Sequence, residues 1–218
     1  MASEKEELKL ITGMLPAIGI GTAIVVGIGL LGRAFTERRV YAQEDDRYLV
    51  SVRYPGQRHD LREFVQPDNP DVLAVYSQYG PDPWALYDFV CKSVSYRLDF
   101  GEFWMTPSET LRGYGDCEDS SILLTSLIRA GGAPDCYVAL GSLGGYGHAW
   151  VLNNNEILET TYSSAQFVPN IAAYESMALF NDAEVLELYP GALDDVFSLR
   201  RDEVTKLNLM ARERVGQW

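Results

Sequence analysis

The sequence is poor in cysteine and histidine, and this scarcity excludes several kinds of protein. Its 218 residues include three cysteines and two histidines, which are Cys91, Cys117, Cys136, His59 and His148. So few cysteines, widely spaced, cannot build a disulfide framework or a zinc cage of thiolates. A His-rich metal centre is excluded for the same reason. The odd number of cysteines leaves at least one thiol without an intramolecular partner, although a disulfide between Cys91 and Cys136 stays open.

Positive charge is also scarce. The chain has 18 Lys and Arg residues against 31 Asp and Glu residues, which gives a net charge of -13. No basic surface of domain size is available, so we expect no nucleic acid as a partner. Hydrophobic residues make up 47% of the chain and suffice for a real core. This composition excludes wholesale disorder and leaves room for one or two domains.

One long apolar run lies near the N-terminus. Residues 10–32 carry no charge, and such a helix reaches across a hydrocarbon core of about 30 Å. The run is too long for the core of a signal peptide. We therefore predict a single-pass transmembrane helix at residues 10–32 that anchors the chain in a lipid bilayer, with a slight preference for a cytoplasmic C-terminal part. Its glycines favour packing in a homo-oligomer or larger assembly. The alternative is a Gly-rich buried helix or an assembly arm inside a particle.

The rest of the chain divides into zones. We expect an N-terminal tail before the apolar run, then a juxtamembrane linker and N-terminal extension, a main domain, and a C-terminal helix, at residues 1–9, 33–80, 81–190 and 191–218. Alternating hydrophobicity predicts a strand near residues 48–54, and turn-forming residues predict a loop over 55–71. Apolar spacing predicts helices at about 83–97 and 190–215.

Cys117 stands at the predicted start of a helix. It follows a Gly-rich turn and precedes apolar residues at helical spacing, which end at a Gly-Gly pair. A helix N-terminus offers N–H groups that can hold an oxyanion, and it lowers the pKa of a thiol. The acidic residues on both sides of Cys117 oppose a thiolate, so the sulfur needs a cationic partner. His148 is the only good candidate in this region.

The segment around His148 has the pattern of a β-hairpin. Residues 147–152 and 155–160 are two predicted strands joined by a two-residue Asn-Asn turn. That turn pairs His148 directly with Glu159. Glu159 can then accept from one ring nitrogen and leave the other for Cys117, as in a nucleophile, base and orienting-residue arrangement. A one-residue slip would place Glu159 on the opposite face.

The cysteine and histidine segments together carry a family resemblance. The Thr-Pro and Gly-Asp-Cys-Glu-Asp segments lie within residues 106–119, and Gly-His-Ala-Trp-Val occupies 147–151. Over about half the chain they resemble the transglutaminase-like cysteine peptidase superfamily, and the first part is most similar to the bacterial transglutaminase-like cysteine proteinases. The resemblance implies a papain-like α+β fold, in which the helix of a nucleophile, Cys117, packs on an antiparallel sheet with a base, His148. The family's third residue is usually Asp, and Glu159 stands in that place.

The resemblance also implies some secondary roles. Some bacterial members bind calcium near the nucleophile, which makes Asp116, Glu118 and Asp119 weak calcium candidates. No other cofactor is required. Trp84 and Trp104 are candidates for an oxyanion donor or a substrate wall, with core packing as the alternative.

Two functions are compatible with these residues. The first is a membrane-anchored thiol amidase or peptidase that cleaves a peptide or carboxamide bond of a protein or peptide substrate through an acyl-enzyme. Cys117, His148 and Glu159 would form its triad, and transamidation would follow if an amine replaced water. The second is a catalytically silent module of the same fold, acting as a structural or peptide-binding component of a membrane or viral particle assembly.

Overall fold

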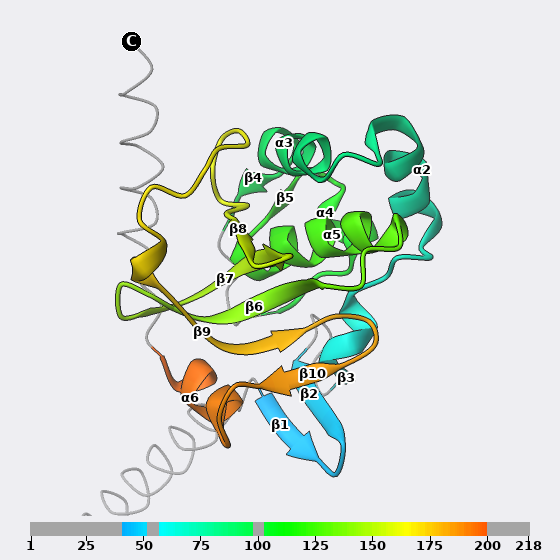
Figure 1. Ribbon diagram of the computed structural model, residues 1–218. Helices are drawn as coiled ribbons and strands as arrows, with labels where there is room; N and C mark the ends of the chain where they lie inside the picture. The colour runs from blue at the N-terminus through cyan, green and yellow to red at the C-terminus, as the bar shows by residue number, and fades with distance from the viewer. Residues whose placement is uncertain (1–40, 52–56, 98–102, 200–218) are drawn as a thin grey trace, which may run out of the picture. The chain divides into compact units, whose positions relative to one another are not determined.

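A five-stranded antiparallel sheet lies at the centre of the protein (Figure 1). The structure is a computed structural model that describes residues 41–51, 57–97 and 103–199. The strands occur in the spatial order β10-β9-β6-β7-β8. They are β6 (Cys136–Leu143), β7 (Tyr146–Asn153), β8 (Glu156–Leu158), β9 (Tyr174–Phe180) and β10 (Val185–Glu187).

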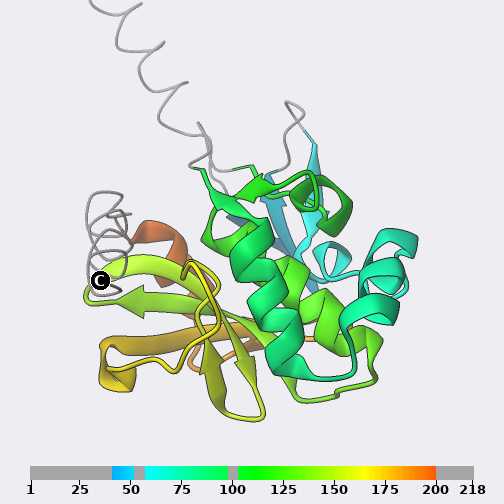
Figure 2. The same cartoon turned by 90° about the horizontal axis from the view of Figure 1, so that it is seen from above.

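Helices form two layers on one face of this sheet (Figure 2). Helix α5 (Cys117–Ala130) packs directly on β6 and β7, and α2 (Pro70–Tyr79) and α3 (Pro83–Ser93) pack on α5. The short elements before α5 are β4 (Ser95–Tyr96), α4 (Pro107–Thr110) and β5 (Tyr114–Gly115). Because α5 lies between the sheet and two helices, its residues from Cys117 to Ile128 are all buried.

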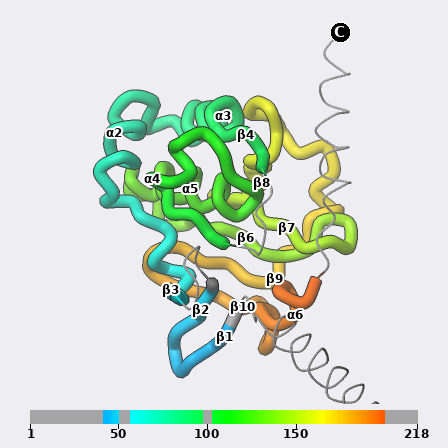
Figure 3. Tube along the Cα trace, turned by 180° about the vertical axis from the view of Figure 1, so that it is seen from behind, coloured from blue at the N-terminus to red at the C-terminus, as the bar shows by residue number. Residues whose placement is uncertain are grey.

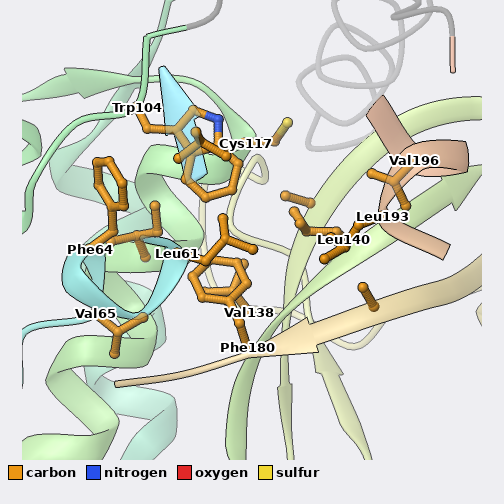
Figure 4. Packing of buried hydrophobic residues seen from close by; sticks show 14 residues of the cluster. Leu61, Phe64, Val65, Trp104, Cys117, Val138, Leu140, Phe180, Leu193 and Val196 are labelled. Atoms are coloured by element: carbon orange, nitrogen blue, oxygen red, sulfur yellow. The ribbon is translucent and has the colours of Figure 1, made fainter. Parts of the chain in front are cut away.

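The remaining elements lie around β9 and β10 (Figure 3). They are β1 (Tyr41–Glu44), β2 (Arg47–Ser51), β3 (Arg58–Asp60), the 3-10 turns η1 (Leu61–Phe64) and η2 (Ile171–Ala173), and α6 (Ala192–Ser198). Strands β1 to β3 form a separate antiparallel sheet. Val50 of this sheet belongs to the same buried cluster as Phe180 of β9, Leu193 of α6 and Trp104 (Figure 4). A shared core therefore joins both ends of the described chain to the central sheet.

Helix α5 begins at Cys117 for a local reason. Asp116 and Asp119 form a reciprocal capping box, in which each side chain accepts a hydrogen bond from the other residue's backbone N–H. Such a box satisfies donors that the first turn of a helix leaves without partners. The helix ends before Gly131, as the Gly-Gly pair predicted. The sequence prediction of this helix is confirmed.

The turn of the β7–β8 hairpin lies one residue later in the chain than the sequence predicted. The predicted turn lies at the first two of three consecutive asparagines, whereas the structure pairs Asn153 with Glu156 across a turn at Asn154 and Asn155. Both turn residues have positive φ, 48° and 65°, as a type I′ turn requires. Moving the turn by one residue shifts the cross-strand partner of each residue by two positions. Because side chains alternate between the two faces of a strand with a period of two, this shift leaves each side chain on the same face. Glu159 therefore stays on the His148 side of the sheet, although the two residues are not directly opposed.

The predicted membrane-anchored architecture is corrected. Within the ranges given above, no helix is long and apolar enough to cross a bilayer. The predicted span, residues 10–32, lies outside those ranges. The described ranges therefore have an α+β fold with antiparallel sheets and no membrane-spanning helix, and the prediction of a single-pass membrane protein is corrected for these residues.

Three further expectations differ from the structure. The predicted loop over 55–71 contains β3 and η1 and leads into α2, which begins at Pro70 behind an Asn69 cap. The helix expected to reach residue 97 ends at Ser93, and the chain then enters the short strand β4. The C-terminal helix is described only as α6, and the residues after Leu199 lie outside the description.

Candidate active site

His148 and Glu159 form a buried pair on the sheet. The His148 Nε2 atom lies 2.7 Å from the Glu159 Oε2 atom, and each side chain is 1% exposed. An ionised carboxylate only accepts hydrogen bonds, so Nε2 carries the proton in this contact. The lone pair of a neutral His148 ring is therefore on Nδ1. The extra methylene of Glu relative to Asp suits this geometry, because a diagonal cross-strand contact is longer than a direct one.

The Glu159 carboxylate receives four hydrogen bonds. The hydroxyl of Tyr174 donates to Oε2 at 2.9 Å, beside the bond from His148. The backbone N–H and hydroxyl of Thr161 donate to Oε1 at 3.0 and 2.6 Å. Sequence patterns did not identify either residue. The Glu-Thr-Thr order makes a local bond to Thr161 foreseeable, whereas Tyr174 reaches Glu159 only because β9 returns beside β6.

The charges of the pair stabilise each other. Burial by itself lowers the pKa of His148, but the Glu159 charge, together with the nearby Cys117, raises it to about 9. Burial by itself raises the pKa of Glu159, but the His148 charge and the hydrogen bonds from His148 and Thr161 lower it to about 2. Burial and the Glu159 charge raise the pKa of Tyr174, so its hydroxyl stays a donor. The pair thus favours an imidazolium beside a carboxylate at neutral pH.

Cys117 lies close to His148. It is the first residue of α5, is 2% exposed, and lines one cavity together with His148 and Trp104. Its sulfur is close enough for its charge and hydrogen bonding to contribute to the raised pKa of His148. Among the described residues, however, His148 Nδ1 has no hydrogen bond of ordinary geometry. The Cys117 Sγ instead donates to Glu118 Oε2 at 3.1 Å.

The two candidate tryptophans have different surroundings. Trp104 is 3% exposed, lines the Cys117 cavity and packs on Phe64 and Phe180. Its indole Nε1–H is buried and has no hydrogen-bond partner in the part of the chain that the structure describes. Figure 4 shows Trp104 and Cys117 at the same end of the buried cluster. Trp84 packs on other aromatic rings and does not line the cavity. Of these two candidates, only Trp104 lines the Cys117 cavity.

The acidic residues beside Cys117 have structural uses. Both oxygens of Asp119 are occupied, because Oδ1 accepts from the Met105 N–H at 2.8 Å and Oδ2 accepts from the Asp116 N–H at 3.2 Å. Burial, followed by the charges of Glu118 and Asp119, raises the pKa of Asp116 well above its usual range. Calcium prefers six to eight oxygen ligands. Nowhere in the described ranges do three or more His, Cys, Asp or Glu residues form a group that could hold a metal ion.

Cys136 and His59 lie outside this site, whereas the Cys91 Sγ donates to the backbone oxygen of Glu159 at 3.9 Å. Cys91 and Cys136 are buried free thiols, without a disulfide between them. Burial raises the pKa of Cys136 to about 12, which makes it an unreactive thiol at neutral pH. His59 contacts Glu63 at 2.6 Å on an exposed part of the molecule. Cys117 is therefore the one described cysteine that shares a cavity with a histidine.

Solved structures of LapG from Legionella pneumophila are similar to this chain. One covers 62% of this chain and 97% of its own at 15% identity, with a TM-score of 0.41. The EGTA-treated form covers 69% and 98% at 16% identity, with a TM-score of 0.42. The calcium-bound form covers 69% and 99% at 15% identity, with a TM-score of 0.39. No family model and no curated protein matches the chain. Function must therefore be inferred from the geometry of the site.

Proposed function

We propose that this protein is a thiol amidase or peptidase that acts on a peptide or carboxamide bond through Cys117, His148 and Glu159. The observation that carries the proposal is the 2.7 Å contact between His148 and Glu159, buried beside the cavity that contains the Cys117 sulfur. A buried charged pair is costly unless it is well hydrogen-bonded. A histidine with one nitrogen held by a carboxylate and the other facing a thiol is the arrangement that activates a sulfur nucleophile.

The reaction begins when the neutral His148 ring accepts the Cys117 Sγ proton at Nδ1, which creates the imidazolium–thiolate pair that the raised pKa of His148 favours. To reach Nδ1, the thiol turns away from Glu118, and the resulting thiolate faces the imidazolium that Glu159 stabilises. The thiolate attacks the substrate carbonyl carbon, and the carbonyl electrons move to oxygen. The backbone N–H of Cys117, at the helix N-terminus, and the indole N–H of Trp104 are the groups that we assign to hold this oxyanion.

The second half of the reaction releases the product. When the tetrahedral intermediate collapses, the C–N bond breaks and Nδ1 of His148 returns its proton to the leaving amine. An acyl-enzyme remains on Cys117. Water then loses a proton to His148 and attacks the thioester, which releases a carboxylic acid and restores the thiol. An amine in place of water gives transamidation through the same steps.

A catalytically silent module is the second candidate. It is favoured by the burial of Cys117, which is 2% exposed, and by the bond from its thiol to Glu118. In that case the His148–Glu159 pair only stabilises the sheet, and the same fold serves as a structural or peptide-binding component. The two candidates differ in the reactivity of the Cys117 sulfur.

The decisive experiment uses p-nitrophenyl acetate as an activated acyl donor, because no natural substrate is required. Acylation of Cys117 is followed by mass spectrometry of the intact protein and of its peptides, and turnover by release of nitrophenol. We expect acylation and turnover in the wild type, loss of both in C117S, and a fall of about a hundredfold or more in H148A. The matched control is C136A, which removes a buried thiol outside the site. A Cys117 that reacts as slowly as free cysteine would establish the silent module.

A further inference from the structure

The C-terminal part of the described chain lies over the Cys117 cavity. Val196 and Phe197 of α6 and the following Leu199 line this cavity together with Cys117 and His148. Leu199 is also close to the start of β7, because a Cβ atom built on Gly147 would lie 3.3 Å from the Leu199 Cβ atom. The end of α6 thus contacts the strand that carries the histidine.

This coverage leaves little space next to the sulfur. The cavity provides about 30 Å³ for the centres of water-sized molecules, which suits one or two waters. Binding pockets for small molecules usually measure about 300–1,000 Å³. A peptide bond with its flanking residues cannot enter while residues 197–199 keep this position. If Cys117 reacts with a peptide, this segment must move first.

The segment has a fixed end and a loosely held end. Leu193 and Val196 are buried, and the Leu193 N–H donates to Glu187 Oε1 at 2.9 Å, which ties α6 to the strand β10. Phe197 and Leu199 are only partly buried, and the Phe197 ring packs on Trp104 with the ring centroids 6.2 Å apart. The Leu199 N–H donates to Val196 O at 3.1 Å, a bond within the segment itself. The last residues can therefore leave the cavity while the start of α6 stays in the core.

We propose that residues 197–199 are a built-in cover of the Cys117 site, which a peptide substrate displaces as it binds. This inference rests on the proposed function, since it names the regulation of the same site. The cover presents apolar side chains to a cavity whose walls include Trp104 and Leu140. A displacing peptide must satisfy the same walls, so the substrate class is a peptide with apolar side chains next to the bond that is cleaved.

The first test measures access to the sulfur without requiring catalysis. Cys117 is alkylated with iodoacetamide, and the rate is read by peptide mass mapping in the wild type, F197A, L199A and S198A. Loss of apolar contacts that hold the cover shut should raise the rate about tenfold in F197A and L199A. S198A is the matched control, because Ser198 is exposed and does not line the cavity. Equal rates in all four proteins would overturn the proposal.

The second test locks the cover. In the double variant with Gly147→Cys and Leu199→Cys, the two Cβ atoms lie about as close as in a disulfide, whose usual spacing is 3.5–4.5 Å. The oxidised protein should lose alkylation of Cys117, and reduction should restore it. Each single variant, taken through the same cycle, controls for oxidation of Cys117. Failure to form this crosslink, or unchanged alkylation after it forms, would overturn the proposed cover.

The outcomes separate the cover from the proposed reaction. Faster alkylation of L199A without acyl turnover from p-nitrophenyl acetate leaves the cover standing and rejects the enzyme. Turnover in the wild type, with no change in F197A and L199A, leaves the enzyme standing and rejects the cover. Faster alkylation together with faster turnover supports both.

Discussion

Replacing Glu159 by Gln tests how the histidine is held. All four hydrogen bonds to the Glu159 carboxylate come from donors on His148, Tyr174 and Thr161. Glutamine keeps the size but replaces one accepting oxygen by an NH2 group that donates. The backbone N–H of Thr161 can only donate, so the amide oxygen must face Thr161. The NH2 group must then face His148.

This orientation places the histidine proton on the wrong nitrogen. With a donor opposite Nε2, the His148 ring must accept there and carry its proton on Nδ1, the nitrogen that serves Cys117. The ring also loses the Glu159 charge, which is the larger of the two charges that raise its pKa against the effect of burial. Because one pKa unit is a factor of ten in the ratio of the two protonation states, the imidazolium–thiolate population should fall by about tenfold or more.

The assay is alkylation of Cys117 by iodoacetamide at pH 7, compared between the wild type and E159Q. The cover over the cavity is the same in both proteins, so the ratio of the rates reports the histidine alone. E156Q is the matched control, because it makes the same change in β8 at a residue outside the site. Circular dichroism verifies that E159Q is folded. If folded E159Q reacts as fast as the wild type, the assigned role of Glu159 is refuted.

Three further predictions follow from the same contacts. Y174F removes one hydrogen bond to a charged group, which typically contributes about 1.5–3 kcal/mol, so acylation by p-nitrophenyl acetate should slow about tenfold; an unchanged rate contradicts the positioning role of Tyr174. The raised pKa of His148, about 9, and the lowered pKa of Glu159, about 2, mean that the pair stabilises the fold fully only between pH 4.5 and 6.5. This stabilisation is lost as pH rises through 9 or falls through 2. The free energy of unfolding by urea should therefore differ most between the wild type and E159Q within that window, and a difference that does not change with pH contradicts this prediction. G141A should lower the free energy of unfolding by about 2 kcal/mol or more, because a Cβ atom on residue 141 would lie 2.0 Å from Glu175 O. An unchanged urea midpoint would show that the β9 backbone does not lie this close to Gly141.

The start of α5 could be predicted because its causes lie within a few residues. The Asp116–Asp119 capping box and the following apolar residues are local in sequence, and together they fix Cys117 as the first helical residue. The apolar residues of this helix predict that it is buried, but the burial of its polar face could not be predicted. Its hydroxyl residues look solvent-facing in sequence, yet Ser120 and Ser126 are buried and hydrogen-bonded, because α2, α3 and the sheet enclose α5.

In the β7–β8 hairpin, the face on which each side chain lies could be predicted, but the position of the turn could not. Three consecutive asparagines offer two possible turns, and the sequence does not distinguish them. Either turn keeps His148 and Glu159 on one face, because shifting a two-residue turn by one position changes the pairing by an even number. The contact was therefore predictable even though the direct pairing was wrong.

The segments between 55 and 80 were predicted least well. The prolines and glycine that indicate a loop are also residues that begin helices and end strands, and Pro70 is the first residue of α2. Tertiary packing decides between these uses, since Val72 of α2 is fully buried only after α5 is in place.

The sequence by itself determined the chemistry that this chain can offer: a thiol at a helix N-terminus, and an imidazole and a carboxylate on one face of a hairpin. These features depend on helix capping and strand periodicity, which act over a few residues. Only the tertiary structure decided that Tyr174 joins the carboxylate and that Val196, Phe197 and Leu199 lie over the sulfur. Those contacts join segments distant in the chain, and they depend on how the sheet and α6 pack around a common core.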